Sequence, residues 1–285
     1  MAPSTKQRQI KEIVRCGKDP VHFINRYLKV QHPTRGLIPF NTYPFQDDCI
    51  EEFNEHRFNI ILKSRQLGIS TISAAYAVWL ACFYRDKNVL IIATKLAVAQ
   101  NFIKKVKIAL RSMPKWLLVP EIVSNNKQTV EFSNGSQIKA VPTSDDAGRS
   151  EALSLLIVDE AAFIRNFDEL FTGLYPTLST GGRAIILSTP NGVGGQYHDL
   201  WIKAESGENE FNPIKLPWDV HPEHDEDWFQ NESRNLSKKQ IAQELLCDFA
   251  ASGDTFLSHD DIQYLGASIR TPIERWGPEM GVWVW

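Results

Sequence analysis

Short apolar runs alternate with longer segments of helical periodicity through the middle of the chain. Four of these runs predict buried strands, at residues 58–62, 88–94, 153–159 and 184–188. Apolar residues three and four positions apart predict helices, the clearest at 98–110, and a further helix is predicted at 237–247. Asn134-Gly135 predicts a hairpin turn. Continuous apolar strands separated by helices indicate an α/β fold with a mainly parallel sheet that is covered on both faces.

The two ends of the chain follow other patterns. The first 40 residues carry helical periodicity and end in a loop that Pro33, Gly36 and Pro39 indicate. After about residue 208 the sequence becomes polar and acidic. We therefore expect four parts, namely an N-terminal helical segment at 1–40 that packs with a lid, a core at 41–208, a lid subdomain at 209–265 and a linker at 266–285.

Composition narrows the class of protein only slightly. Apolar residues make up 43% and charged residues 23%, the values of an ordinary soluble globule. The net charge of −3 means that contact with nucleic acid would need a local basic patch. The predicted helix at 98–110 carries such a basic face, which either touches DNA phosphates or is simply solvated. The longest apolar run is about half of a membrane span, so no membrane partner is expected.

One stretch has the strand–loop–helix context of a phosphate-binding loop. The segment from Lys63 to Thr71 follows a buried strand and precedes an apolar, alanine-rich helix. Gly68 is the glycine before the helix, and Ser70 holds the position of the hydroxyl that binds Mg²⁺. The rest of the loop would direct backbone N–H groups at the phosphates, through Ser64, Arg65, Gln66, Leu67, Ile69 and Thr71.

Two further stretches end strands of the same predicted sheet. Asp159 would hold the Mg²⁺ shell, and Glu160, one residue further, would polarise the attacking water. Ser188 and Thr189 follow another apolar strand, where their hydroxyls would sense the γ-phosphate. Ligands bind at the carboxyl ends of strands in open α/β sheets. Together the three stretches predict a site for ATP and Mg²⁺.

The phosphate-binding loop lacks its usual lysine. Ile69 stands directly after the second glycine of the pattern, where lysine is usual, and Lys63 takes the place of the first glycine. Because Lys63 closes the preceding strand, its long stem would let it reach the phosphates as a relocated cation. The alternative is a degenerate loop that keeps only its shape. The retention of Ser70, Asp159 and Glu160 favours the working site.

These motifs resemble those of a known family. SRQLG at residues 64–68, LLIVDEAAFI from residue 155, and STPNG at residues 188–192, followed by YHDLW, resemble the ATPase domain of the large terminase subunit of tailed bacteriophages. The resemblance covers roughly residues 40–260. It implies a RecA-like P-loop ATPase core with a small lid, in which these motifs act as Walker A and Walker B. It also implies an enzyme that hydrolyses ATP to drive double-stranded DNA into an empty procapsid.

The resemblance also assigns roles to three residues outside the strand ends. Gln46 stands where terminases keep a glutamine that recognises adenine, for which its amide offers a donor and an acceptor. Arg149 stands where an arginine finger would reach the γ-phosphate of a neighbouring subunit. Arg65, inside the loop, is the competing finger that would act within its own subunit.

The partners implied by the resemblance are those of a packaging motor. They are double-stranded DNA, the portal protein, the small terminase subunit and further copies of the chain, in a ring expected to contain five subunits; isolated chains would be monomers. Such a protein works in the host cell cytoplasm, attached transiently to the procapsid portal, and is absent from the mature virion. Large terminases normally continue into a nuclease domain, and we expect residues 266–285 to be the linker toward it. Because the acids that would bind the metal of that domain are missing, we expect no nuclease activity from this chain.

Two other functions remain as alternatives. Asp159-Glu160-Ala161-Ala162 resembles the DExx box of superfamily 2 DNA helicases and translocases. Such helicases need a second α/β domain, and the segment after residue 208 is too short to form one. The second alternative is a scaffold that binds nucleotide without hydrolysing it, which holds if the loop with Ile69 is degenerate.

Overall fold

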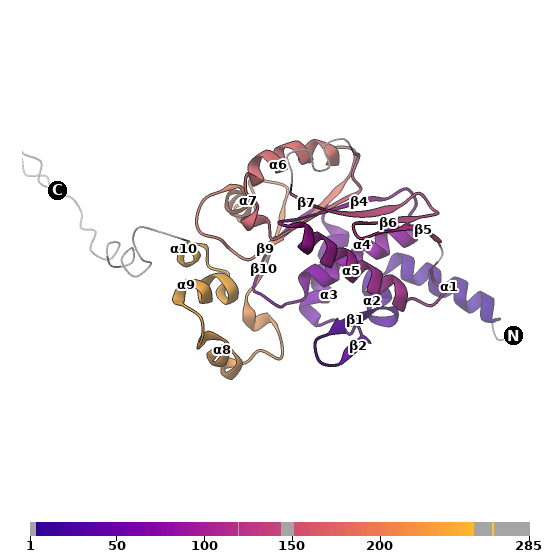
Figure 1. Ribbon diagram of the computed structural model, residues 1–285, viewed down its shortest axis with the longest axis horizontal. Coiled ribbons are helices and arrows are strands. Elements are labelled where there is room, and N and C mark those ends of the chain that lie inside the picture. Colours follow the sequence, from indigo (N-terminus) through magenta and orange to yellow (C-terminus); the bar gives the residue numbers. More distant parts are fainter. Residues whose placement is uncertain (1–3, 119, 144–150, 254–263, 265–285) are drawn as a thin grey trace, which may run out of the picture.

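A computed structural model of the chain describes residues 4–118, 120–143, 151–253 and 264. Its centre is an eight-stranded sheet in the order β10-β3-β9-β8-β4-β7-β6-β5, with helices on both faces (Figure 1). The first six strands of that order are parallel, and β6 and β5 run antiparallel at one edge. The strands are β3 (Phe58–Lys63), β4 (Asn88–Ala93), β5 (Ile122–Asn125), β6 (Thr129–Phe132), β7 (Gln137–Pro142), β8 (Leu155–Asp159), β9 (Arg183–Ser188) and β10 (Asn212–Leu216). The predicted α/β class and mainly parallel sheet are confirmed.

The central strands are buried on both faces because alternate side chains belong to two separate cores. In β8, for example, Leu155 and Ile157 pack in one core, whereas Leu156 and Val158 pack in the other. The helices of the first core are α3 (Pro44–Glu55), α4 (Ile69–Phe83) and α5 (Leu96–Ser112). Those of the second are α6 (Phe167–Leu174) and α7 (Gln196–Glu205), with the 3-10 turns η1 (Ala161–Phe163) and η2 (Tyr175–Leu178) nearby.

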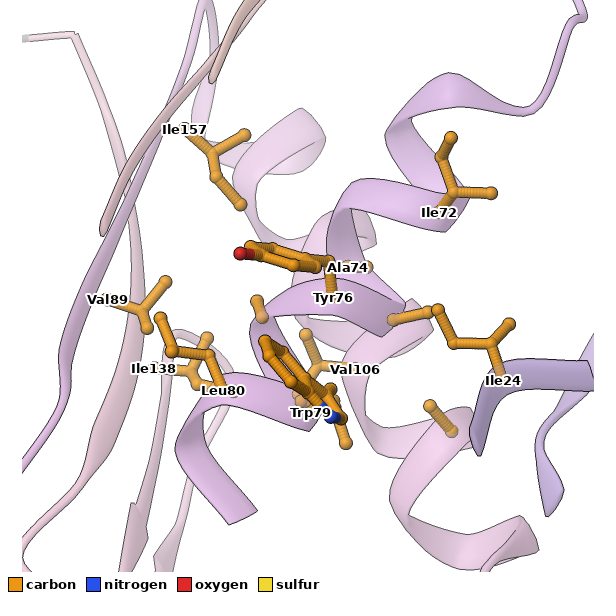
Figure 2. Packing of buried hydrophobic residues seen from close by; sticks show 14 of the residues in the cluster. Ile24, Ile72, Ala74, Tyr76, Trp79, Leu80, Val89, Val106, Ile138 and Ile157 are labelled. Carbon is orange, nitrogen blue, oxygen red and sulfur yellow. The ribbon is translucent and has the colours of Figure 1, made fainter. Parts of the chain in front are cut away.

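Helix α4 is enclosed almost all round, which explains its uninterrupted apolar sequence. Figure 2 shows Tyr76 and Trp79 of this helix between strand residues such as Val89 and Ile24 of the N-terminal region. The indole of Trp79 also donates a hydrogen bond of 2.8 Å to the carbonyl of Cys16. The N-terminal helices are therefore part of the first core.

Those N-terminal helices are α1 (Thr5–Lys18) and α2 (Pro20–Tyr27). A capping box of Ser4 and Gln7 begins α1, and the Asp19 side chain caps α2. The segment predicted as a loop is instead a small hairpin of β1 (Lys29–His32) and β2 (Gly36–Pro39). Gly36 allows its tight turn by adopting a left-handed φ of +72°.

The segment after β10 contains short helices that gather at one side of the body (Figure 1). They are the 3-10 turn η3 (Trp218–Val220), α8 (Glu226–Ser233), α9 (Lys238–Ile241), the π-helical turn η4 (Ala242–Leu246) and α10 (Phe249–Ser252). The helix predicted at 237–247 is thus α9 continued by a π-helical turn. The proposed division into core and lid stays a prediction, and the expected linker at 266–285 lies outside the described residues.

The hairpin predicted at Asn134-Gly135 is confirmed, since β6 and β7 pair antiparallel across it and Gly135 has a φ of +82°. Strands β5 and β10 carry too few apolar residues in a regular pattern for the sequence to predict them. Helix α6 does have apolar residues at helical spacing, at Phe167, Leu170, Phe171 and Leu174, and was not among the predicted helices. Over the described ranges, no helix has the combined length and apolar character that crossing a membrane requires.

Candidate nucleotide-binding site

The phosphate-binding loop lies between β3 and α4, as the sequence predicts. Gly68 caps the helix with a φ of +75°, and Gln66 also has a left-handed φ of +61°. The left-handed backbone favours glycine at this position, and a Cβ added there would lie 2.7 Å from Nε2 of Gln46, whose side chain would have to shift. The N-terminal N–H groups of the 15-residue helix are therefore open to an anion at the carboxyl edge of the sheet.

Lys63 lies at this same edge, as the last residue of β3. Only 6% of the residue is exposed, and its Nζ donates a hydrogen bond of 3.1 Å to Oε1 of Glu160. The two residues belong to strand ends that β9 separates in the sheet. A cation is thus present beside the loop although the usual lysine position holds Ile69.

Ile69 occupies a core position. It is 1% exposed and belongs to the hydrophobic cluster beneath α4. A side chain on the first residue of this helix points into the core, which favours an apolar residue. The burial of Ile69 thus gives a packing reason for an apolar residue at this position, and Lys63 is a buried cation beside the loop.

Asp159 and Ser70 face each other across the site. The Ser70 hydroxyl donates a hydrogen bond of 3.1 Å to Oδ1 of Asp159. Burial, and then the negative charge of Glu160, raise the pKa of Asp159, while Lys63 and Lys105 oppose the rise. A buried carboxylate and a hydroxyl at this distance suit a hard cation that prefers oxygen ligands. Ser70 and Asp159 thus fit the Mg²⁺ that the family implies.

The backbone turns sharply directly after β8. Glu160 adopts a left-handed conformation with a φ of +56°, which is costly for a residue with a side chain. The N–H of Ala162 donates a hydrogen bond of 3.1 Å to the hydroxyl of Ser188, the last residue of β9. Thr189 follows and is buried. Ser188 therefore holds the acidic turn in place, and its sensing of the γ-phosphate stays a prediction.

Gln46 contacts the loop directly. Its Nε2 donates a hydrogen bond of 2.8 Å to the carbonyl of Leu67, and its Oε1 accepts one of 3.1 Å from the N–H of Tyr43. Both functions of the amide are thus satisfied by backbone groups, and the side chain supports the loop. Recognition of adenine by Gln46 stays a prediction. To bind adenine, the amide would have to give up these hydrogen bonds to the backbone.

Arg65 is held by a residue that the sequence did not indicate. Its Nε lies 2.8 Å from Oε2 of Glu244, on the π-helical turn η4, although 68% of the arginine side chain is exposed. The carbonyl of Glu244 also accepts hydrogen bonds of 2.9 Å from the N–H of Arg65 and from the hydroxyl of Ser64. Glu244 therefore joins the segment after β10 to the phosphate-binding loop. No short-range pattern could reveal a pair that lies 180 residues apart in the chain.

Lys105 is a second cation that acts on the acidic pair. It lies half-buried on α5, where burial lowers its pKa and the charges of Asp159 and Glu160 oppose that change. It lies three residues after Phe102 and four before Ala109, which are both buried, and this spacing is the signal that separates it from the solvated face. On the same helix, Nζ of Lys107 donates to the carbonyl of Asn126 at 2.6 Å. The basic residues of α5 are thus not one uniform exposed face.

The choice between the two arginine fingers stays open. Arg149 lies outside the described residues, so only Arg65 has a place in the structure. The other predicted site residues lie at the carboxyl edge of the sheet, as the sequence predicts. They are the loop residues with Ser70, then Asp159, Glu160, Ser188 and Thr189.

Three solved structures share the fold. The large terminase ATPase domain of Thermus phage P74-26 is 20% identical with a TM-score of 0.61, and the match covers 74% of this chain and 95% of that one. The large terminase of a thermophilic bacteriophage, in complex with ADP, is 11% identical with a TM-score of 0.61, covering 73% and 53%. The HK97 bacteriophage large terminase is 16% identical with a TM-score of 0.58, covering 88% and 52%. The chain thus spans about half the length of the ADP-bound terminase and of the HK97 protein.

A family model extends this likeness from the fold to the sequence. Residues 60–264 match the model described as "Terminase large subunit, T4likevirus-type, N-terminal". The match covers more than half of the chain and includes the loop, both acids and the strand end at Ser188. The chain therefore belongs to the T4likevirus-type family of terminase large subunits, in the part that this N-terminal model describes.

Proposed function

We propose that the chain is the ATPase motor part of a phage large terminase, which hydrolyses ATP to move double-stranded DNA into a procapsid. The observation that carries the proposal is the convergence of Lys63, Ser70, Asp159 and Glu160 at one edge of the sheet. These side chains are the cation, the hydroxyl and the two acids that hydrolysis of a nucleoside triphosphate needs. The likeness to a large terminase solved in complex with ADP supports the choice of nucleotide.

Each residue has a separate chemical task. Ser70 and Asp159 would hold Mg²⁺, which neutralises charge on the β- and γ-phosphates when it is bound. The backbone N–H groups of the loop and Lys63 would bind the phosphates. Glu160 would accept a hydrogen bond from water and orient it toward the γ-phosphate. The left-handed backbone at Glu160 turns this carboxylate toward Lys63 and the loop.

The ion pair between Lys63 and Glu160 bears on the proposed mechanism. Lys63 and Glu160 neutralise each other, so neither is available for the phosphates or the water. Binding of a triphosphate would draw Lys63 away and release Glu160 for water.

The remaining features of the motor are proposed from the family. A homo-oligomeric ring on the portal protein, with the small terminase subunit as a further partner, would bring Arg149 of one subunit to the site of the next. Work in the host cytoplasm, transient attachment to the portal and absence from the mature virion follow from the same role.

Phosphate release by the purified protein tests the proposal. With Mg²⁺, ATP and duplex DNA, we expect the parent protein to release phosphate and the Glu160→Gln variant to release almost none. Binding of a fluorescent ATP analogue is measured on the same samples. If the parent binds the analogue but releases no phosphate at any protein or DNA concentration, the chain is a nucleotide-dependent scaffold and the proposal fails.

A further inference from the structure

Positive charge is concentrated in the first helix of the chain. Helix α1 carries five basic residues and one acid, a net charge of +4, which leaves −7 for the rest of a chain whose total is −3. Four of its cations are spaced three, four and three residues apart, at Arg8, Lys11, Arg15 and Lys18. This spacing places all four on one face of the helix. The chain as a whole is weakly acidic, but this face is strongly basic.

The cations of this face have no fixed side-chain partner in the described part of the chain. All four side chains are exposed, and within the described part of the chain none of them forms an ion pair or a side-chain hydrogen bond. Glu12, the acid of the helix, is already engaged, because it lies 2.7 Å from Nε2 of His22 and accepts a hydrogen bond of 2.9 Å from the hydroxyl of Tyr27. The four cations are therefore free to meet an external anion.

A cavity extends this face toward α2. It has a volume of about 670 Å³, larger than the cavity of about 380 Å³ beside η1 and α7. Arg8 and Arg15 line it from α1, and Arg26 lines it from α2. Glu12 also lines it, with its carboxylate engaged by His22 and Tyr27. The rings of Tyr27 and Trp116 form its apolar part. They pack edge to face, with their ring centroids 5.7 Å apart. Three guanidinium groups around a concave surface are suited to phosphate, which arginine binds with two N–H groups at once.

We infer that the basic face of α1, defined as Arg8, Lys11, Arg15 and Lys18, binds the phosphate backbone of duplex DNA together with Arg26. The row from Arg8 to Lys18 is about 15 Å long at 1.5 Å per residue. Duplex DNA carries one negative charge per about 1.7 Å of its axis, so a row of this length meets several phosphates. The inference locates a DNA contact and rests on the proposed function for the choice of DNA as the polyanion.

Duplex DNA fits this face better than an acidic protein does. The exposed apolar residues of α1, Ile10 and Val14, are offset to one side of the row of four cations. A helical partner would use an apolar stripe as its main contact, whereas phosphate binding needs only cations. The α5 helix is the weaker candidate, since Lys105 is half-buried and the ammonium groups of Lys104 and Lys107 are hydrogen-bonded to Asn101 and Asn126.

Binding of a short fluorescent duplex of arbitrary sequence, measured by anisotropy over a range of salt concentrations, tests the inference. The test variant is Arg8→Gln, Lys11→Gln, Arg15→Gln and Lys18→Gln combined. The matched control removes four other exposed cations, by Lys127→Gln, Arg165→Gln, Lys203→Gln and Arg234→Gln. For the test variant we expect the slope of log affinity against log salt to fall by about three to four units, and affinity at low salt to fall at least about tenfold.

The control variant should retain most of the parental affinity and slope. Equal losses of affinity in both variants would show that only total charge matters, which would overturn the inference. It would also be overturned if the test variant bound duplex like the parent, or if the parent bound no duplex. ATP turnover without DNA is measured on all three proteins and should be the same, because α1 does not contact the nucleotide site. If turnover is absent while DNA binding depends on α1, the proposed function fails and the DNA contact remains.

Discussion

Lys63 and Glu160 form an ion pair of 3.1 Å between the end of β3 and the residue after β8. The pair joins a residue of the phosphate-binding loop to the acid that we propose as the base. Seven per cent of the lysine side chain is exposed, so its charge is shielded from water and is paired with Glu160. Both halves of this pair are open to direct tests.

Replacing Lys63 by alanine should weaken nucleotide binding and turnover. Loss of a charge-assisted contact in a shielded site costs about 1.5–3 kcal/mol, which is about ten- to a hundredfold. Lys63→Arg should restore only part of the loss, because a planar guanidinium does not reproduce a point charge on a thin stem. Nucleotide titration and phosphate release are the measurements, and Lys203→Ala, at an exposed lysine of α7, is the matched control. Parental behaviour of Lys63→Ala would mean that Arg65 or another subunit supplies the cation.

Glu160→Gln should abolish turnover while nucleotide binding persists. The amide keeps the shape of the side chain but cannot accept a proton, and loss of a general base costs at least about a hundredfold in rate. Lys63 loses its ionic partner in this variant, so affinity for ATP should be equal to that of the parent or higher. Glu169→Gln, at an exposed acid of α6, controls for the loss of one negative charge. Near-parental phosphate release by Glu160→Gln would remove this residue from the mechanism.

Ile69→Lys tests whether packing explains the missing lysine. Because Ile69 is 1% exposed in the core, a lysine there would have to bury its charge or displace its neighbours. We expect a loss of about 2–4 kcal/mol in the free energy of unfolding, against about 0.5–1.5 kcal/mol for the control Ile69→Val. Chemical denaturation gives both values. An Ile69→Lys protein of parental stability that rescues Lys63→Ala would show that the position is a usable cation site.

Local patterns predicted the strands and the acids that carry the chemistry. Asp159 and Glu160 end a continuous apolar run, and such runs become central parallel strands whose carboxyl ends must meet at one edge. Ile69 was equally visible in the sequence, but its burial was not, because only the packing of α4 decides which way its first residue points.

Long-range contacts set the limit of sequence analysis for this chain. Glu244 binds the loop through its backbone carbonyl and its carboxylate, and it lies on a π-helical turn that no periodicity distinguishes from an α-helix. Gln46 was predicted from resemblance as a ligand of adenine, and that role stays a prediction. Its hydrogen bonds to backbone groups of the loop and of Tyr43, at the start of α3, were not predicted. Such pairings depend on tertiary structure alone.

Mixing of subunits distinguishes the two arginine fingers. If Arg149 acts on the site of a neighbouring subunit, Arg149→Ala and Glu160→Ala proteins should each be inactive but partly recover turnover when mixed, since each supplies what the other lacks. Activity per subunit should also rise with protein concentration. Phosphate release is measured alongside light scattering, which confirms that mixed assemblies form. Mixed assemblies without recovered turnover would favour Arg65 acting within its own subunit.

The buried carboxylate of Asp159 should make the nucleotide-free protein less stable as pH rises. Burial and the charge of Glu160 raise the pKa of Asp159, so between its ordinary pKa and this raised value the folded chain binds more protons than the unfolded chain. Stability is therefore lost as pH rises through that window, and the cost persists above it.

In the presence of a chelator, Asp159→Asn should melt at a higher temperature than the parent at neutral pH. This difference in melting temperature should shrink as the pH falls toward the ordinary pKa of aspartate. The same variant should lose Mg²⁺-dependent nucleotide binding, because Asp159 is the proposed ligand. Thermal melts from acid to neutral pH measure the effect on stability. An Asp159→Asn protein that is less stable than the parent at every pH would show that Lys63, Lys105 and Ser70 already compensate the buried charge.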